Sequence, residues 1–306
     1  KCWNLYITES EEMSMEYAVN IRGLSKAYKD FSLKDVDILL PKGAIMGLIG
    51  ENGAGKSTTL KAMLDIVRRD SGGVEILGLD LDTDQQRIKE QIGVVWGESH
   101  FHEFLDGIQV SHMLGRIYRN WDQELFLDYM GRFALPGKKK IKDYSKGMQM
   151  KLSIAAALSH HPSLLILDEA TSGLDPVVRD EILDILFGFI EDGEHSVLIS
   201  SHITSDLDKV ADYITMIHNG SILFSEEKDA LIEDMGIIKC SQEELQSLKE
   251  LESRGGITIV GVRQSAYQSE CLVRSSREVM ERYPALVMDR TNIEEIMLFY
   301  VRGQMR

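Results

Sequence analysis

The stretch that decides the fold is Gly50-Glu51-Asn52-Gly53-Ala54-Gly55-Lys56-Ser57-Thr58. A nearly all-apolar run, 44–49, precedes it, and a helical pattern, 59–67, follows it. Glycines allow backbone N–H groups to curl around a β-phosphate, and the positive end of the following helix adds to the attraction. Lys56 then reaches the β- and γ-phosphates, while the Ser57 hydroxyl is a ligand for Mg²⁺. This context favours an ATP-binding loop at residues 50–58 over an ordinary glycine-rich turn.

An acidic pair, Asp168 and Glu169, follows a second apolar run, 164–167. Open α/β sheets place their ligands at the carboxyl ends of buried strands. Asp168 therefore suits the Mg²⁺ shell, and Glu169 suits polarising the water that attacks the γ-phosphate. Alone, such a pair is most often the solvated start of a helix. Beside a phosphate loop, the catalytic interpretation is favoured.

Short apolar runs and helical patterns alternate over most of the chain, which indicates an α/β domain with parallel strands. Besides 44–49 and 164–167, the runs 93–96 and 197–200 are nearly all apolar and bounded by turn or polar residues. A mostly helical stretch, 102–157, interrupts them. The expected fold class is α/β, a P-loop NTPase core with a mostly parallel sheet, an inserted helical subdomain and a small C-terminal α+β appendage.

The pattern divides the chain into three parts. Residues 1–14 are expected to be an N-terminal extension, and residues 15–230 the ATPase domain, with its helical subdomain at about 98–160. Residues 231–306 are expected to form a small α+β accessory domain. Its predicted elements are a helix at 242–253, strands at 257–262 and 271–273, and a terminal helix at 291–301 with Asn292 as its N-cap.

Composition excludes several classes of protein. The chain has 306 residues and a net charge of -15, and an acidic chain repels phosphate backbones, so nucleic acid is not an expected partner. The basic run 138–140 is interpreted as a solvated loop. No apolar stretch approaches the roughly 20 residues of a spanning helix, and no signal peptide is expected. Three widely spaced cysteines, Cys2, Cys240 and Cys271, are typical of reduced thiols in a cytoplasm.

From about residue 15 to 225, several motifs occur in one order that resembles the nucleotide-binding subunits of ATP-binding-cassette (ABC) transporters. Tyr144-Ser145-Lys146-Gly147-Met148-Gln149 is similar to the family's signature motif, with Lys146 where Gly is usual and Met148 where Gln is usual. The resemblance implies that Ser145, Lys146, Gly147 and Met148 contact ATP held by the opposite subunit. A hydroxyl, a glycine and a helix N-terminus also make an anion site. Without the resemblance, these residues would be interpreted as a helix cap.

Three further matches imply roles. Ser172-Gly173-Leu174-Asp175 resembles the D-loop, which communicates across the dimer; the alternative is an ordinary turn. His202 resembles the switch histidine at the γ-phosphate, against the alternative of a structural histidine. Tyr28 resembles the aromatic that stacks on adenine, and the alternative is packing within a strand.

One position departs from the family. A Gln that senses the permease and reaches Mg²⁺ or the attacking water is expected after the strand 93–96, but Gly97 stands there, with Glu98 next. We hypothesise that Glu98 takes over as a Mg²⁺ ligand after a one-residue shift that the freedom of Gly97 permits. The alternative is that Glu98 is merely solvated.

The ending Asn292-Ile293-Glu294-Glu295-Ile296-Met297-Leu298-Phe299-Tyr300 resembles the bacterial drug and peptide export branch (ABC-2 type). The resemblance implies an ATPase that uses ATP and Mg²⁺ and dimerises, with itself or a similar chain, around two ATP. It would power export of a drug, peptide or other amphipathic substrate through a separate transmembrane permease, on the inner face of the cell membrane. The alternatives are a soluble ABC-superfamily ATPase and a non-catalytic nucleotide sensor. A sensor would be expected to lose Glu169 or His202, and both are present.

Overall fold

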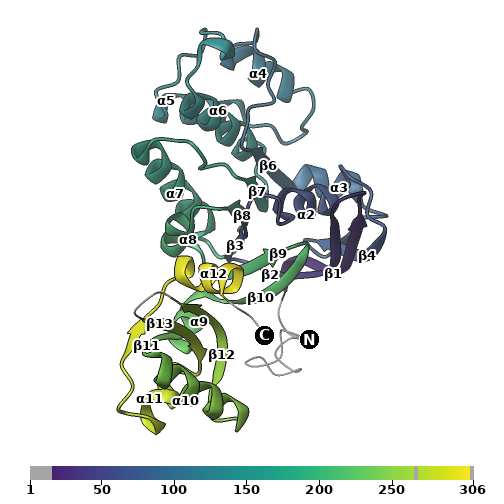
Figure 1. Cartoon of the computed structure of the whole chain (residues 1–306). Coiled ribbons are helices and arrows are strands. Elements are labelled where there is room, and N and C mark those ends of the chain that lie inside the picture. The colour runs from purple at the N-terminus through teal and green to yellow at the C-terminus, as the bar shows by residue number, and fades with distance from the viewer. Residues whose placement is uncertain (1–15, 265–267, 304–306) are drawn as a thin grey trace. The chain divides into compact units, whose positions relative to one another are not determined.

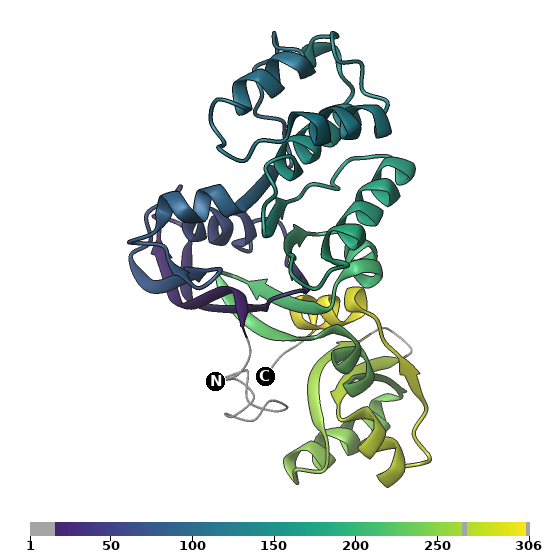
Figure 2. The same cartoon turned by 180° about the vertical axis from the view of Figure 1, so that it is seen from behind.

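The computed structural model describes residues 16–264 and 268–303. The chain divides into two compact units, Lys1–Ser225 and Glu226–Arg306. The extension expected at residues 1–14 lies outside the described residues. Figures 1 and 2 show the chain from opposite sides. Within the described ranges, no helix has both the length and the apolar character needed to cross a membrane.

A six-stranded sheet forms the centre of the larger unit. Its strands are β3 (Ile45–Ile49), β6 (Ile92–Trp96), β7 (Leu164–Asp168), β8 (Ser196–Ser201), β9 (Tyr213–His218) and β10 (Ser221–Glu227). The order is β10-β9-β3-β8-β7-β6, and β9, β3, β8, β7 and β6 run parallel. Every residue of β3, β7 and β8 is buried, which explains their near-continuous apolar sequence. The four predicted buried strands are confirmed to within one residue at each end.

A second, antiparallel sheet lies beside the first and was not among the sheets predicted. It consists of β1 (Tyr17–Ala27), β2 (Ser32–Pro41), β4 (Ser71–Ile76) and β5 (Leu79–Asp80), in the order β2-β1-β4-β5. Ile21 and Ile38 of this sheet share one hydrophobic cluster with Leu48 of β3 and with Leu60. The two sheets are therefore packed together through the helix that carries Leu60.

That helix, α2 (Lys56–Met63), corrects the predicted range of 59–67. It starts earlier because Lys56 and Ser57 already belong to its first turn. It ends earlier because Asp65 has a left-handed backbone, with φ of 54°. Residues after Met63 therefore cannot continue the helix. The phosphate loop and the first turn of α2 form one continuous structure.

Helices cover both faces of the central sheet. One face packs against α2, and α7 (Pro176–Ile190) and α8 (Thr204–Val210) pack on the strands from the other side. Leu207 of α8 lies so close to β3 that a Cβ atom on Gly47 would be 2.8 Å from it. A short helix, α3 (Gln85–Gln91), leads into β6. This covering holds the carboxyl ends of β3, β7 and β8 at one edge.

Between β6 and β7 the chain forms a helical insertion, as expected for residues 102–157 (Figure 1). Its elements are α4 (Gly107–Leu114), α5 (Gln123–Arg132), a 3-10 turn (Ile141–Asp143) and α6 (Lys146–Leu158). The three helices begin at capping side chains, Asp106, Asp122 and Ser145. The insertion has a hydrophobic cluster of its own, which includes Phe126.

The smaller unit has a four-stranded antiparallel sheet in the order β12-β13-β11-β14. Its elements are α9 (Lys228–Asp234), β11 (Gly236–Cys240), α10 (Gln242–Ser253), β12 (Thr258–Gln264), β13 (Ser269–Arg274), α11 (Ser276–Arg282), β14 (Met288–Arg290) and α12 (Ile293–Arg302). The segment from β11 to β14 has the order of a split β-α-β fold. The predicted helix at 242–253 is confirmed. Asn292 caps α12 by accepting a 2.9 Å hydrogen bond from the amide of Glu295, as predicted.

Two cysteines that are far apart in sequence meet in this unit. Cys240 on β11 and Cys271 on β13 are free, buried thiols with their Sγ atoms 4.0 Å apart. Burial raises the pKa of Cys240, and burial together with the neighbouring thiol raises the pKa of Cys271 to about 12. Both thiols are therefore protonated at neutral pH.

Candidate active site

The phosphate loop connects the end of β3 to the start of α2. Gly55, the residue before α2, has φ of 121°, and a Cβ atom there would lie 2.8 Å from the side chain of Leu33. At Gly50, a Cβ atom would collide with the carbonyl oxygen of Ile217. Only glycine allows the backbone to take this course. The loop thereby turns the N-terminus of α2 toward the pocket, which favours binding of an anion.

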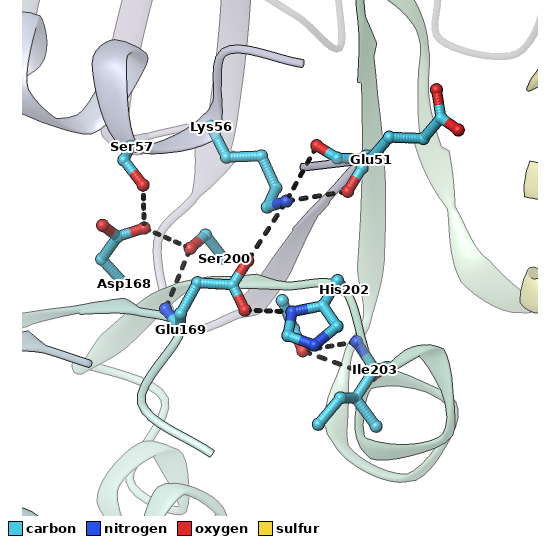
Figure 3. Close-up of polar contacts among 10 residues, drawn as sticks. Glu51, Lys56, Ser57, Asp168, Glu169, Ser200, His202 and Ile203 are labelled. Carbon is cyan, nitrogen blue, oxygen red and sulfur yellow. Dashed lines mark hydrogen bonds and ion pairs between the residues drawn. The ribbon is translucent and has the colours of Figure 1, made fainter. Parts of the chain in front are cut away.

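Lys56 folds back over this loop. Its Nζ donates hydrogen bonds to the carbonyl oxygens of Gly50, at 2.7 Å, and Glu51, at 3.3 Å. Nζ also lies 3.1 Å from Oε1 of Glu169 (Figure 3). Lys56 is only 5% exposed, so its charge depends on these oxygen atoms for stabilisation. The ammonium group is thus fixed where the loop opens into the pocket.

Asp168 ends β7 and is also buried. Its Oδ1 accepts a 3.0 Å hydrogen bond from the Ser57 hydroxyl and a 2.6 Å hydrogen bond from the Ser200 hydroxyl. The predicted metal ligands Ser57 and Asp168 are therefore brought together, although they are 111 positions apart in the sequence. Both present oxygen atoms, the donors that Mg²⁺ prefers.

Glu169 follows with an unusual backbone, since its φ of 54° lies in the left-handed region. Its side chain enters the pocket between the ammonium group of Lys56 and the imidazole ring of His202. Oε2 is hydrogen-bonded to Nδ1 of His202, and Oε1 is paired with Lys56 (Figure 3). The structure thus brings together both residues that were predicted to be catalytic.

A pocket of about 700 Å³ contains most of the predicted ATP-binding set. Its lining consists of Asp30, Phe31, Glu51, Asn52, Gly53, Gly55, Lys56, Ser57, Thr58, Glu169, Ser172 and His202. Gly50 and Ala54 lie in the loop but are not part of the lining. Phe31 and Asp30 were not predicted from the sequence. They belong to the turn between β1 and β2, where neither residue forms part of a recognisable motif.

Tyr28 lies in the same turn but outside the lining. Its side chain is 47% exposed, and its ring centroid is 6.5 Å from that of Phe31. Because β1 ends at Ala27, Tyr28 is not packed within a strand. An exposed ring next to the pocket is compatible with the predicted stacking on adenine.

The signature segment lies on the helical insertion, away from this pocket. Ser145 caps α6 through a 3.2 Å hydrogen bond from the amide of Met148, so the motif does begin a helix. A Cβ atom on Gly147 would touch Val178 of α7 at 3.4 Å. None of Ser145, Lys146, Gly147 or Met148 lines the pocket that contains the phosphate loop. This placement is compatible with a contact to nucleotide on another subunit.

The predicted D-loop connects the pocket to the signature segment. Ser172 lines the pocket, and Leu174 is buried. Gly173 has φ of 69°, and a Cβ atom there would lie 2.8 Å from Nζ of Lys146. Asp175 caps α7 by accepting hydrogen bonds of 3.1 Å from the amides of Val177 and Val178. The segment is therefore a tight turn with defined contacts on both sides.

Glu98 is not brought to the Mg²⁺ ligands. It is exposed and lines a separate pocket of about 340 Å³, together with Trp96 of β6 and residues of the helical insertion. The neighbouring Gly97 lies against the active site, where a Cβ atom would be 3.2 Å from the carbonyl oxygens of Asp168 and Glu169. The predicted role of Glu98 as a Mg²⁺ ligand finds no support in this placement.

The fold and the site together define a P-loop ATPase with a helical insertion. A sequence profile of the ABC transporter family matches residues 33–172. The bacitracin transport ATP-binding protein BcrA of Enterococcus faecalis is 33% identical over 215 residues, which cover 69% of this chain and 70% of that protein. The lantibiotic transport ATP-binding protein SrtF of Streptococcus pyogenes is 34% identical over 218 residues, covering 69% of this chain and 91% of that protein. The chain belongs to the ATP-binding subunits of ABC transporters.

Solved structures share its fold. An ATP-binding subunit of an ABC transporter matches with a TM-score of 0.64 at 24% identity, over 78% of this chain and 98% of that one. A dimeric ATP-binding cassette bound to ADP and phosphate matches with a TM-score of 0.62 at 22% identity, over 68% of this chain and 98% of that one. As a member of this family, the chain is an ATPase whose reaction is coupled to transport. The alternative of an uncoupled soluble ATPase gains no support from these relatives.

Proposed function

We propose that the chain powers export of a drug, peptide or other amphipathic molecule through a separate transmembrane permease. The relatives named for bacitracin and lantibiotic transport support this substrate class. A third relative, the daunorubicin/doxorubicin resistance ATP-binding protein DrrA of Streptomyces peucetius, supports it as well. It is 30% identical over 243 residues, which cover 77% of this chain and 73% of that protein. The chain would act on the inner face of the cell membrane, held there by the permease. Its net charge of -15 disfavours nucleic acid as a partner.

The observation that carries the ATP-hydrolysing part of this proposal is the position of the Glu169 carboxylate, between Lys56 and His202 at the pocket of the phosphate loop. Lys56 would bind the β- and γ-phosphates, and the backbone of residues 50–58 would surround them. The nucleotide's negative charge then competes with Glu169 for the ammonium group. Release of the carboxylate from Lys56 makes it available to orient water.

Ser57 and Asp168 fit a Mg²⁺ ion, because a hydroxyl and a carboxylate oxygen already lie 3.0 Å apart at the phosphate loop. Among residues 16–264 and 268–303, no cluster of three or more His, Cys, Asp or Glu could hold a metal ion alone. Oxygen atoms from nucleotide and water would therefore complete the shell. When bound, Mg²⁺ supplies positive charge to the β- and γ-phosphate oxygens.

In the hydrolytic step, Glu169 would accept a proton from water as the water oxygen bonds to the γ-phosphorus. The bond between the γ-phosphorus and the bridging oxygen of ADP breaks, and ADP and phosphate are the products. His202 would bind the γ-phosphate and hold Glu169 in position. Because Glu169 and His202 are hydrogen-bonded, movement of either one changes the other's position.

We also propose that two nucleotide-binding subunits close around two ATP molecules. The segment Ser145–Met148 would contact the nucleotide of the opposite subunit, because none of its residues lines the nucleotide pocket of its own subunit. Lys146, which replaces the usual Gly, adds a positive charge that suits a phosphate. Either a homodimer or a heterodimer satisfies this arrangement.

For Glu98 we propose a role in sensing the permease. The pocket that it lines lies between β6 and the helical insertion, and its other walls include Phe101 and Tyr118. Gly97, the neighbour of Glu98 in the chain, lies against the backbone of Asp168 and Glu169. A partner bound at Glu98 would therefore influence the acidic pair through one residue.

Membrane co-purification tests the transport proposal. The chain would be expressed with a multi-span membrane protein as the candidate permease, the membranes solubilised in detergent, and the complex reconstituted in vesicles. We expect the two chains to co-purify and an amphipathic peptide to stimulate phosphate release. If the chain remains outside the membrane fraction and hydrolyses ATP at full rate without a partner, the alternative of an uncoupled ATPase is correct.

A further inference from the structure

Ser200 is a buried hydroxyl beside the proposed active site. It lies on β8 with no exposed surface, next to the apolar residues Val197, Leu198 and Ile199. A hydroxyl in an apolar strand costs free energy unless it is hydrogen-bonded. The residue is two positions before His202, on the strand between β3 and β7. Its hydroxyl therefore needs hydrogen-bond partners inside the protein.

The Ser200 hydroxyl bridges the two members of the acidic pair (Figure 3). It donates a 2.6 Å hydrogen bond to Oδ1 of Asp168 and accepts a 3.1 Å hydrogen bond from the amide of Glu169. Ser200 and Asp168 are register partners on adjacent parallel strands, so their side chains leave the sheet on the same side. One side chain thus contacts both residues on which Mg²⁺ binding and hydrolysis would depend.

The first bond fixes the carboxylate of Asp168. Its Oδ1 accepts from Ser57 as well as from Ser200. Ser57 can direct an oxygen lone pair to Mg²⁺ and still donate its O–H to Asp168, so both serines would hold Oδ1 when the ion is bound. Of the two donors, Ser200 is the one that is fully buried and does not line the nucleotide pocket, so its bond holds the rotation of this carboxylate from within the sheet. Hydrogen bonds that orient a metal ligand in this way influence the affinity for the metal.

The second bond fixes the backbone of Glu169. Left-handed φ is unfavourable for a residue with a side chain, and surrounding contacts must hold it. The Glu169 amide donates both to the Ser200 hydroxyl and to the Ser200 carbonyl oxygen, each at 3.1 Å. Gly97 packs against the same turn, because a Cβ atom there would lie 3.2 Å from the carbonyl oxygens of Asp168 and Glu169. The direction in which the Glu169 carboxylate enters the pocket therefore depends on Ser200.

We propose that Ser200 is a positioning residue, which holds the Asp168 carboxylate for Mg²⁺ and the Glu169 backbone for hydrolysis. This inference rests on the proposed function of the site. Ser200 is fully buried and does not line the nucleotide pocket, so its effect would pass through Asp168 and Glu169. Loss of the hydroxyl should weaken Mg²⁺-dependent binding more than binding of the nucleotide itself.

The test compares Ser200→Ala with Ser196→Ala in the full chain. Ser196 lies on the same strand with no exposed surface, and its hydroxyl accepts a 2.9 Å hydrogen bond from the amide of Gly43, far from the acidic pair. Both variants lose one buried hydroxyl. ATP affinity would be measured by calorimetry with Mg²⁺ and with EDTA, and Mn²⁺ binding to the complex with a non-hydrolysable ATP analogue would be measured by electron paramagnetic resonance.

For Ser200→Ala we expect Mn²⁺ affinity to fall about tenfold, as typical for a lost partner of a metal ligand. ATP affinity in EDTA should stay within about twofold of the unchanged protein. Ser196→Ala should leave both values unchanged, and Ser200→Thr, which keeps a hydroxyl, should restore Mn²⁺ affinity. If Ser200→Ala does not fold, Ser200→Cys provides the same comparison, because sulfur is a much weaker donor.

The proposal is overturned if Ser200→Ala binds Mn²⁺ as tightly as Ser196→Ala does. It is also overturned if the variant loses ATP affinity equally with Mg²⁺ and with EDTA, which would indicate a general collapse of the pocket. Failure of the proposed function gives a different result. In that case the unchanged protein itself shows no metal-dependent binding of ATP.

Discussion

Oε1 of Glu169 lies 3.1 Å from Nζ of Lys56, so the proposed catalytic carboxylate and the phosphate-binding ammonium group are paired with each other. The side chains are 23% and 6% exposed, so water screens this pair only weakly. A triphosphate carries more negative charge than one carboxylate and competes for the same ammonium group. Nucleotide binding and release of Glu169 are therefore linked events.

Lys56→Ala should weaken ATP binding. A hydrogen bond to a charged group contributes about 2 kcal/mol, which corresponds to about a thirtyfold increase in Kd. Calorimetry of the full chain measures this change. Lys61→Ala is the matched control, because Lys61 is on the same helix but exposed and outside the pocket lining. Unchanged ATP affinity in Lys56→Ala would contradict the assignment of the phosphate loop.

Tyr28→Ala should weaken binding of ATP but not of inorganic triphosphate. Stacking of a base on an aromatic ring contributes roughly 1–3 kcal/mol, and triphosphate has no base to stack. Competition against a fluorescent nucleotide gives both affinities. The control is Phe31→Ala, whose ring is partly buried and packs on the hydrophobic core, so its main effect should be a lower Tm. A selective loss of ATP affinity in Phe31→Ala alone would move the stacking role to Phe31.

Glu98→Ala separates two possible roles of this residue. Because Glu98 lines the pocket beside the helical insertion, we expect the Mg²⁺ dependence of the isolated subunit to stay unchanged. Stimulation of ATPase activity by the permease should fall several-fold. The measurements are a Mg²⁺ titration of phosphate release, with and without the permease in vesicles. Weaker Mg²⁺ dependence of the isolated subunit would instead support the metal-ligand role.

The buried thiols of the smaller unit should react slowly. The pKa of Cys271 is raised to about 12, so its protonated form is favoured by folding. Its contribution to the free energy of unfolding is complete below about pH 9, the ordinary thiol pKa, and is lost as the pH rises toward 12. In a Cys2→Ser background, a maleimide should label Cys240 and Cys271 rapidly only after denaturation. Rapid labelling of the folded chain at pH 7.5 would contradict the burial.

The sequence predicts the centre of this fold well because its signals are local. Four strands are nearly all apolar, and the phosphate loop, the acidic pair and His202 each lie at the end of a strand or directly after it. Parallel strands then bring these carboxyl ends to one edge. The helix at 242–253 and the Asn292 cap are also encoded by neighbouring residues.

Other features depend on contacts that the sequence pattern does not contain. The antiparallel sheet and the wall formed by Phe31 arise from packing between distant segments. Ser200 has no motif of its own, and the two cysteines become neighbours only through strand pairing. Glu98 was assigned to Mg²⁺ because it stands one residue after the position of the family's glutamine, whereas in the structure it lines another pocket. The signal that could have indicated Ser200 is a polar residue in an apolar strand, two positions before His202.

Glu169→Gln tests the central claim most directly. An amide keeps the size of the side chain but cannot accept the proton from water, and loss of a general base typically costs at least about a hundredfold in rate. Phosphate release would be measured for both proteins, together with size-exclusion chromatography in ATP and Mg²⁺. We predict that the variant binds ATP, loses at least about 99% of turnover and elutes as an ATP-bound dimer. Turnover equal to that of the unchanged protein would contradict the assignment of Glu169 as the catalytic base.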